Sequence, residues 1–104
     1  MDMDKKDMLE RVAKAARRAY MKGFAAGSGG NVSIRIQGQV YISPSGGCLG
    51  DLTAEDMIML EADGFVPSAG GPDYGGRRPS KEAGMHLACY GSRPDILCLF
   101  HLHS

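Results

Sequence analysis

Apolar residues recur at intervals of three and four near the start of the chain, at Met8, Val12, Ala15, Ala16 and Ala19. Charged residues occupy many of the positions between them, which is the pattern of an amphipathic helix that packs one face on a core. Gly23 follows as a residue that can end such a helix. The pattern therefore predicts a first helix that ends close to Gly23.

The hydrophobic period shortens to two after this helix. Apolar and polar residues alternate over residues 32–36, a turn over residues 37–39 contains glycine, and the apolar run 40–42 follows. Two such runs joined by a short turn predict a β-hairpin. Thr53 then resembles a helix cap with an acidic residue at the third helical position, and residues 57–61 are typical of an apolar strand.

A second helix is predicted over about residues 81–90, with Ser80 as its cap and with glycine and proline at positions 91 and 94 to end it. A closing strand begins at about residue 95, and the hydrophobicity of residues 96–100 is that of a buried strand. A chain that stops at residue 104 leaves this strand with nothing after it, so the sequence reads as a piece of a longer domain. The mixture of helices and strands predicts a layered α/β or α+β domain.

Composition excludes some classes of partner. The chain has 104 residues, with 12 Lys and Arg against 12 Asp and Glu, so it has no net charge to attract nucleic acid or anionic lipid over a distance. No apolar run approaches the roughly 20 residues of a membrane-spanning helix. Three cysteines without CxxC spacing indicate reduced thiols rather than a disulfide framework. We therefore expect a cytoplasmic protein with neither nucleic acid nor membrane as a partner.

Glycine- and serine-bearing turns at the ends of the predicted elements could together bind one anion. Backbone N–H groups around Gly30, with the side chain of Asn31, form the first candidate, although this turn alone is more simply a connector. The second turn contains Ser45 and Gly46. Ser80 opens the later helix, whose N-terminus carries a partial positive charge. Lys81 beside it is either a full positive charge for the anion or a solvated lysine.

The last strand carries two histidines at positions i and i+2. His101 and His103 would therefore project to the same side of the strand and could bind one metal ion, although a solvated chain end is the alternative. A catalytic zinc site needs at least three protein ligands, so others must come from elsewhere. Glu82 lies in the first turn of the second helix. His86 shares its face, which is otherwise apolar, and we interpret His86 as a packing or supporting residue rather than a ligand.

Seven motifs occur together in an order and spacing that resemble the class II aldolase/adducin family. They are Gly29-Gly30-Asn31-Val32-Ser33, Ser43-Pro44-Ser45-Gly46, Gly50-Asp51-Leu52-Thr53, Pro79-Ser80-Lys81-Glu82, His86-Leu87-Ala88-Cys89-Tyr90, Arg93-Pro94-Asp95 and His101-Leu102-His103-Ser104. The resemblance covers almost the whole chain. Lys81 and the segment around Cys48 are most similar to the branch that decarboxylates 3-oxo-tetronate 4-phosphates, with fuculose-phosphate aldolases close by.

The resemblance implies a layered α/β/α domain with a mostly antiparallel central sheet, of which residues 1–104 are the N-terminal part only. It implies a divalent metal ion, expected to be Zn²⁺, held by His101, His103 and Glu82, with Glu82 also the catalytic acid/base. Family members are longer, supply a third histidine from the part that is absent here and form homotetramers. We therefore expect the 104-residue chain to be inactive alone. The residues that the resemblance assigns to the substrate phosphate, or next to it, are Gly30, Asn31, Ser45, Gly46, Ser80 and Lys81.

The function that the resemblance implies is a metal-dependent lyase that cleaves a carbon–carbon bond of a small phosphorylated sugar or sugar acid through an enediolate. A sugar-phosphate aldolase of the fuculose type, or an epimerase, is the nearest alternative because these enzymes share the enediolate. A non-catalytic, adducin-like interaction module is the alternative of another class. Such modules typically lack the metal histidines that this sequence has.

Overall fold

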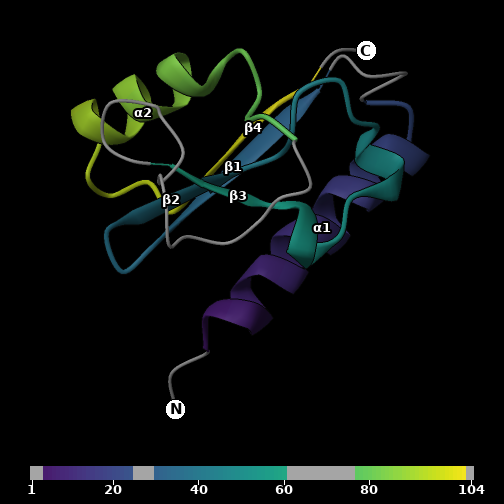
Figure 1. Cartoon of the computed structure of the whole chain (residues 1–104), viewed down its shortest axis with the longest axis horizontal. Helices are drawn as coiled ribbons and strands as arrows, with labels where there is room; N and C mark the ends of the chain where they lie inside the picture. Colours follow the sequence, from purple (N-terminus) through teal and green to yellow (C-terminus); the bar gives the residue numbers. More distant parts are fainter. Residues whose placement is uncertain (1–3, 25–29, 61–76, 103–104) are drawn as a thin grey trace.

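The computed structural model describes residues 4–24, 30–60 and 77–102. Within these ranges, four antiparallel strands form a sheet in the order β3-β2-β1-β4, and two α-helices cover its opposite faces (Figure 1). This is the layered α/β/α arrangement with an antiparallel sheet that the resemblance implies. In chain order, the elements are α1 (Lys5–Met21), β1 (Asn31–Ile36), β2 (Gln39–Ile42), the 3₁₀ turns η1 (Leu49–Asp51) and η2 (Ala54–Asp56), β3 (Ile58–Leu60), α2 (Ala83–Ser92) and β4 (Cys98–His101).

Helix α1 forms where the periodicity predicts it. Asp4 caps its first turn by accepting a hydrogen bond from the backbone N–H of Asp7 at 2.8 Å, and Gly23 follows its end with a positive φ of 86°. The buried residues of the helix are Leu9, Val12, Ala13 and Ala16. Ala15 of the predicted apolar face is exposed, because it lines an open apolar pocket between α1 and the strands β1 and β4 instead of packing in the core.

The predicted hairpin is confirmed, with a turn one residue shorter than expected. Gln37 and Gly38 join β1 to β2 with φ values of 51° and 81°. Positive φ at both central residues is the geometry of the two-residue turn that matches the twist of paired strands. Thr53 and Asp56 form the expected capping box at η2, and β3 follows it.

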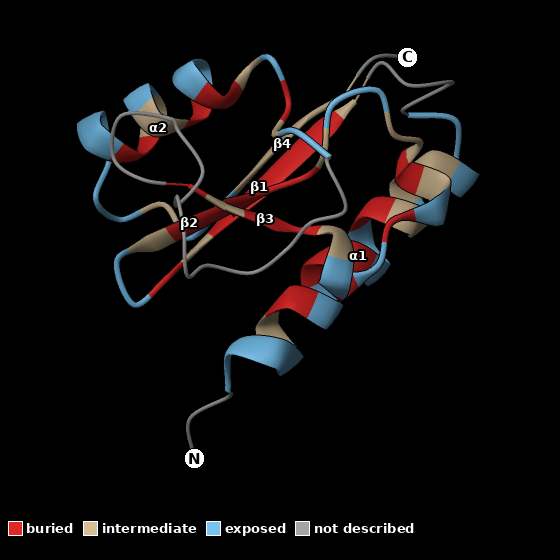
Figure 2. Cartoon of the chain, in the orientation of Figure 1, coloured by how far each residue is buried: buried red, intermediate tan, exposed pale blue. Residues whose placement is uncertain are grey.

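The sheet buries its two faces in two separate clusters. Val32, Ile34 and Ile36 of β1 pack under α1, whereas Val40 and Ile42 of β2 pack under α2 with Ala83 and Tyr90. Figure 2 shows the buried residues along the strands and on the sheet-facing sides of both helices. Because side chains alternate along β1, Asn31, Ser33 and Arg35 face α2, so that polar groups lie between β1 and this helix.

The closing strand has the hydrophobicity of a buried strand but is only partly buried in the described residues. Cys98 is exposed and the other residues of β4 are half-buried, while Leu97 just before it is 64% exposed. β4 lies at the edge of the sheet, where among the described residues it pairs with β1 alone. Neither helix in the described ranges is both long enough and apolar enough to cross a membrane.

Candidate functional site

A pocket of about 280 Å³ lies where three segments meet at one end of the sheet. The segments are the start of β1, the loop after β2 and the turn that precedes α2. Because β1 and β2 are antiparallel, the first residue of one strand lies beside the last residue of the other. The lining residues are Gly30, Asn31, Pro44, Ser45, Gly46, Ser80, Lys81 and Glu82.

Ser43 joins all three segments by hydrogen bonds. Its backbone N–H donates to the carbonyl of Val32 at 2.9 Å, and its hydroxyl accepts from the N–H of Val32 at 3.0 Å. Its carbonyl accepts instead from the N–H of Ser80 at 3.0 Å. The hydroxyl of Ser43 thus replaces its own carbonyl in the β1–β2 ladder, which frees the carbonyl to hold the segment before α2. Sequence reasoning did not single out Ser43, although a serine between a strand and a proline is a visible signal.

All six residues assigned to a substrate phosphate line this one pocket. Ser80 is buried and its hydroxyl accepts a hydrogen bond from the N–H of Glu82 at 3.2 Å, while Lys81 is exposed. Ser45 is held from the other side, because its N–H donates to the carbonyl of Arg78 at 2.8 Å. The arrangement offers hydroxyl and amide donors, a lysine and the N-terminal end of α2, which together suit an anion. That these residues bind phosphate stays a prediction.

Glu82 and His101 meet at the rim of the pocket. In the register of β1 and β4, His101 lies directly opposite Asn31, and its Nδ1 donates a hydrogen bond to the Oε2 of Glu82. The side chain of Glu82 is 38% exposed and that of His101 is 35% exposed, so both are accessible from solvent. His103, the other expected ligand on the last strand, lies outside the described residues.

The donors at this rim suit a metal ion in kind. A carboxylate oxygen and an imidazole nitrogen are both zinc ligands. Within the described ranges, no group of three or more His, Cys, Asp and Glu side chains could hold a metal ion together. Glu82 and His101 thus supply part of a ligand set.

His86 lies behind the pocket and is completely buried. Its Nδ1 is 2.6 Å from the Oγ of Ser33, and its Nε2 hydrogen-bonds the Oδ1 of Asn31. Burial lowers the pKa of His86. The charge of Glu82 opposes this shift and the neighbouring His101 adds to it. The histidine is therefore neutral at pH 7, and its contacts agree with its interpretation as a supporting residue.

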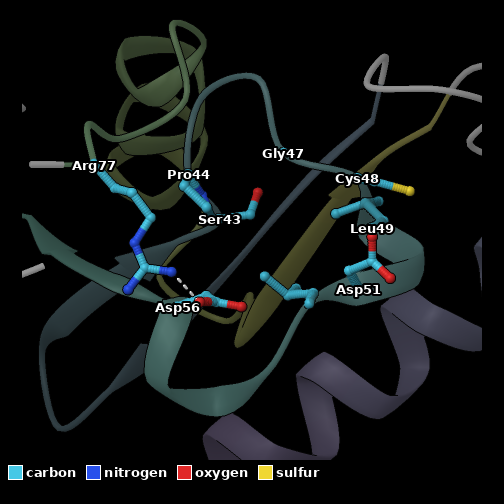
Figure 3. A pocket seen from close by; sticks show the side chains of 9 residues that line it. Ser43, Pro44, Gly47, Cys48, Leu49, Asp51, Asp56 and Arg77 are labelled. Atoms are coloured by element: carbon cyan, nitrogen blue, oxygen red, sulfur yellow. Dashed lines mark hydrogen bonds and ion pairs between the residues drawn. The ribbon is translucent and has the colours of Figure 1, made fainter. Parts of the chain in front are cut away.

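A second, smaller pocket of about 150 Å³ lies on the other side of Pro44, which lines both pockets. Figure 3 shows Arg77 and Asp56 facing one another at its edge, where they form an ion pair. Burial acts to raise the pKa of Asp56, but hydrogen bonds from Thr53 and the nearby Arg77 guanidinium outweigh it and lower the pKa. This ion pair joins η2 to the segment that leads into the first pocket.

Comparison with protein families identifies the class to which this fold and pocket belong. The family described as Class II Aldolase and Adducin N-terminal domain matches residues 10–104. The chain therefore belongs to this family.

Individual relatives carry different activities in their names. The chain is 34% identical to an L-fuculose phosphate aldolase of Methanocaldococcus jannaschii over 102 residues, which cover 98% of this chain and 50% of the relative. It is also 34% identical to a 3-oxo-tetronate 4-phosphate decarboxylase of Haemophilus influenzae over 104 residues, covering 99% of this chain and 45% of the relative. The chain thus spans about half the length of the curated relatives it matches.

Solved structures share the fold. The crystal structure of YgbL from Klebsiella pneumoniae superposes with a TM-score of 0.85 at 31% identity, over 99% of this chain and 47% of that one. An L-fuculose 1-phosphate aldolase from Glaciozyma antarctica superposes with a TM-score of 0.79 at 27% identity, over 96% of this chain and 41% of that one.

Proposed function

We propose that this chain is the N-terminal part of a metal-dependent lyase that cleaves a carbon–carbon bond of a small phosphorylated sugar or sugar acid through an enediolate. The observation that carries the proposal is the contact between Glu82 and His101 at the rim of an anion-suited pocket. The names of the relatives support it, because the aldolase and the decarboxylase both act on sugar phosphates.

The pocket is proposed to bind the phosphate group of the substrate. Asn31, Ser45 and Ser80 supply side-chain donors, and Gly30 and Gly46 allow backbone N–H groups to approach the anion. Lys81 adds a positive charge beside these donors, and the N-terminus of α2 adds a partial one. Binding at this point would leave the carbon chain of the substrate directed towards the rim.

The rim is proposed to carry the chemistry. Glu82, His101 and His103 would hold a divalent ion, which we take to be Zn²⁺, and when bound this ion would stabilise negative charge on neighbouring substrate oxygens. Glu82 is the proposed acid/base, since its carboxylate faces the pocket and can accept or return a proton. The hydrogen bond from His101 keeps that carboxylate at the rim.

The reaction that we propose first is decarboxylation of a 3-oxo-tetronate 4-phosphate, because Lys81 and the segment around Cys48 resemble that branch of the family. An aldolase of the fuculose-phosphate type is the alternative that a specific observation favours, because its relative is equally similar at 34% identity; an epimerase of the same family stays open beside it. An adducin-like scaffold is disfavoured by the paired Glu82 and His101. Enzymes of this kind would work in the cytoplasm.

The remaining half of such a domain is proposed to cover β4. An apolar pocket of about 380 Å³ lies between α1 and the strands β1 and β4, with Met8, Ile34 and Phe100 among its lining residues. The pocket adjoins β4, which within the described residues pairs with β1 and has no strand on its other side. A following segment with apolar side chains would fill this pocket, and the complete chains would associate as homotetramers.

A chimera tests the proposal. The chain is continued by the C-terminal remainder of the Haemophilus influenzae decarboxylase, and carbon dioxide release from a 3-oxo-tetronate 4-phosphate is compared with the release of a triose or glycolaldehyde phosphate from ketose phosphates. Glu82→Gln in the chimera should lower kcat by roughly 10²- to 10⁴-fold, as expected on loss of a general acid/base. Glu55→Gln, on the exposed surface of η2, is the matched control and should leave kcat unchanged.

Three outcomes would contradict parts of the proposal. Unchanged turnover in the Glu82→Gln chimera would remove the acid/base role. Robust lyase activity of the 104-residue chain would refute its assignment as the N-terminal part of a longer domain, because the chain alone should bind Zn²⁺ weakly and turn over no substrate. A folded chimera that binds no divalent ion would favour the scaffold.

A further inference from the structure

We propose that His86 is a positioning residue that fixes the side-chain amide of Asn31 with its two N–H bonds directed into the pocket. The proposal rests on the proposed phosphate pocket. It adds the reason why Asn31 presents hydrogen-bond donors to that pocket. Asn31 is 5% exposed, and a wrongly turned amide would present an oxygen to an anion.

The direction of the amide follows from a chain of four buried groups. The Oδ1 of Asn31 contacts the Nε2 of His86, whose Nδ1 lies 2.6 Å from the Oγ of Ser33. That oxygen lies 2.8 Å from the hydroxyl of Tyr90, which is 4% exposed. Each link has one proton, so the direction of one link determines the others.

Tyr90 sets the direction. Within the described residues, the structure gives its hydroxyl one hydrogen-bond partner, the Oγ of Ser33. If Ser33 donated to Tyr90, the buried O–H of Tyr90 would have no acceptor there, which is costly. Tyr90 therefore donates to Ser33, and the single proton of Ser33 goes to the Nδ1 of His86.

The donors of the other hydrogen bonds in the chain then follow. A neutral histidine that accepts at Nδ1 carries its proton on Nε2, and this proton is donated to the Oδ1 of Asn31. The reverse arrangement would need the proton on Nδ1 and the amide turned by 180°. The amino group of Asn31 is consequently the part left for the pocket that Asn31 lines.

Removing the donor at position 86 should weaken anion binding without any contact between this residue and the anion. His86→Met fills a similar volume but cannot donate, whereas His86→Gln can still donate to Asn31. Loss of one hydrogen bond to a charged group corresponds to roughly a tenfold change in affinity. The dissociation constant for inorganic phosphate, measured by calorimetry on the 104-residue chain, should rise roughly tenfold in His86→Met and change much less in His86→Gln.

A double-mutant cycle separates positioning from general damage. In an Asn31→Ala background, His86→Met should have no further effect on phosphate affinity, because there is no amide left to orient. A purely structural role would weaken binding in both backgrounds by the same factor, and that result would overturn the proposal. Thermal unfolding of each variant shows that it is folded.

The ring proton gives a test that does not need phosphate. A long-range ¹H–¹⁵N spectrum of the chain should show His86 protonated at Nε2, and protonation at Nδ1 would refute the proposal. If the wild-type chain has the Nε2 proton but binds no phosphate, the pocket assignment under the proposed function fails while the orientation of the amide stands. If the chain binds phosphate but His86 carries its proton on Nδ1, the orientation of the amide fails while the pocket assignment stands.

Discussion

Ser43→Ala removes the hydroxyl that accepts the backbone N–H of Val32. Val32 is completely buried and Ser43 is 2% exposed, so water cannot replace the lost acceptor. If the carbonyl of Ser43 turned back to Val32, the N–H of Ser80 would lose its own acceptor instead. Either way one buried backbone donor is left without a partner, which costs about 1–3 kcal/mol.

The free energy of unfolding, measured by urea denaturation of the 104-residue chain, should therefore fall by about 1–3 kcal/mol in Ser43→Ala. Ser45→Ala is the matched control, because Ser45 is exposed, and it should change the value by no more than about 0.5 kcal/mol. A Ser43→Ala protein as stable as the control would refute the argument that this hydroxyl takes the place of the strand carbonyl.

Three further predictions concern stability. Gly50→Ala should destabilise the fold by about 1–3 kcal/mol in thermal or urea unfolding, because its new Cβ would lie 2.5 Å from the ring of Tyr20; no loss would show that the ring moves freely. Because the pKa of His86 is lowered in the folded state, its contribution to the free energy of unfolding is complete above about pH 6.5 and is lost as the pH falls through the folded-state pKa. Unfolding measured at a series of pH values should show this loss of stability. His86→Gln, which has no imidazole to protonate, should lack this part of the pH dependence. The Arg35 guanidinium donates to three carbonyls, one in α2 at Tyr90 and two in the segment between α2 and β4. Arg35→Lys should therefore lower the free energy of unfolding by about 1.5–3 kcal/mol, and an unchanged urea midpoint would contradict this.

The hairpin and the positions of the helices could be predicted because their signals are local, although α2 begins at Ala83 with Glu82 at its N-cap where Ser80 was expected. Alternation over β1 and β2, together with Gly38 in the turn, depends on backbone geometry that no tertiary contact needs to supply. The same holds for the capping box of Thr53 and Asp56. Local signals do not show whether the space between a helix and the sheet is filled, however, so the exposure of Ala15 in the pocket beside β1 and β4 was missed.

The residues alone indicated that three glycine- and serine-bearing turns could share one anion, and the resemblance then assigned individual residues of these turns to the substrate phosphate. Spacing alone could not show that Glu82 and His101 meet, because their contact depends on the pairing of β4 with β1. Ser43 was missed because its importance lies in three hydrogen bonds to distant segments. The hydrophobicity of β4 indicated burial, but its position at the edge of the sheet leaves it partly exposed.

The proposed function depends on Glu82 and His101 binding a divalent ion at the rim of the pocket. Crystals of the chain soaked in Zn²⁺ and phosphate, with data collected at the zinc absorption edge, test this directly. We expect an anomalous peak bonded to the carboxylate of Glu82 and to the imidazoles of His101 and His103, with phosphate density between Asn31 and Ser80. A zinc peak at other residues, with Glu82 and His101 turned away from each other, would contradict it.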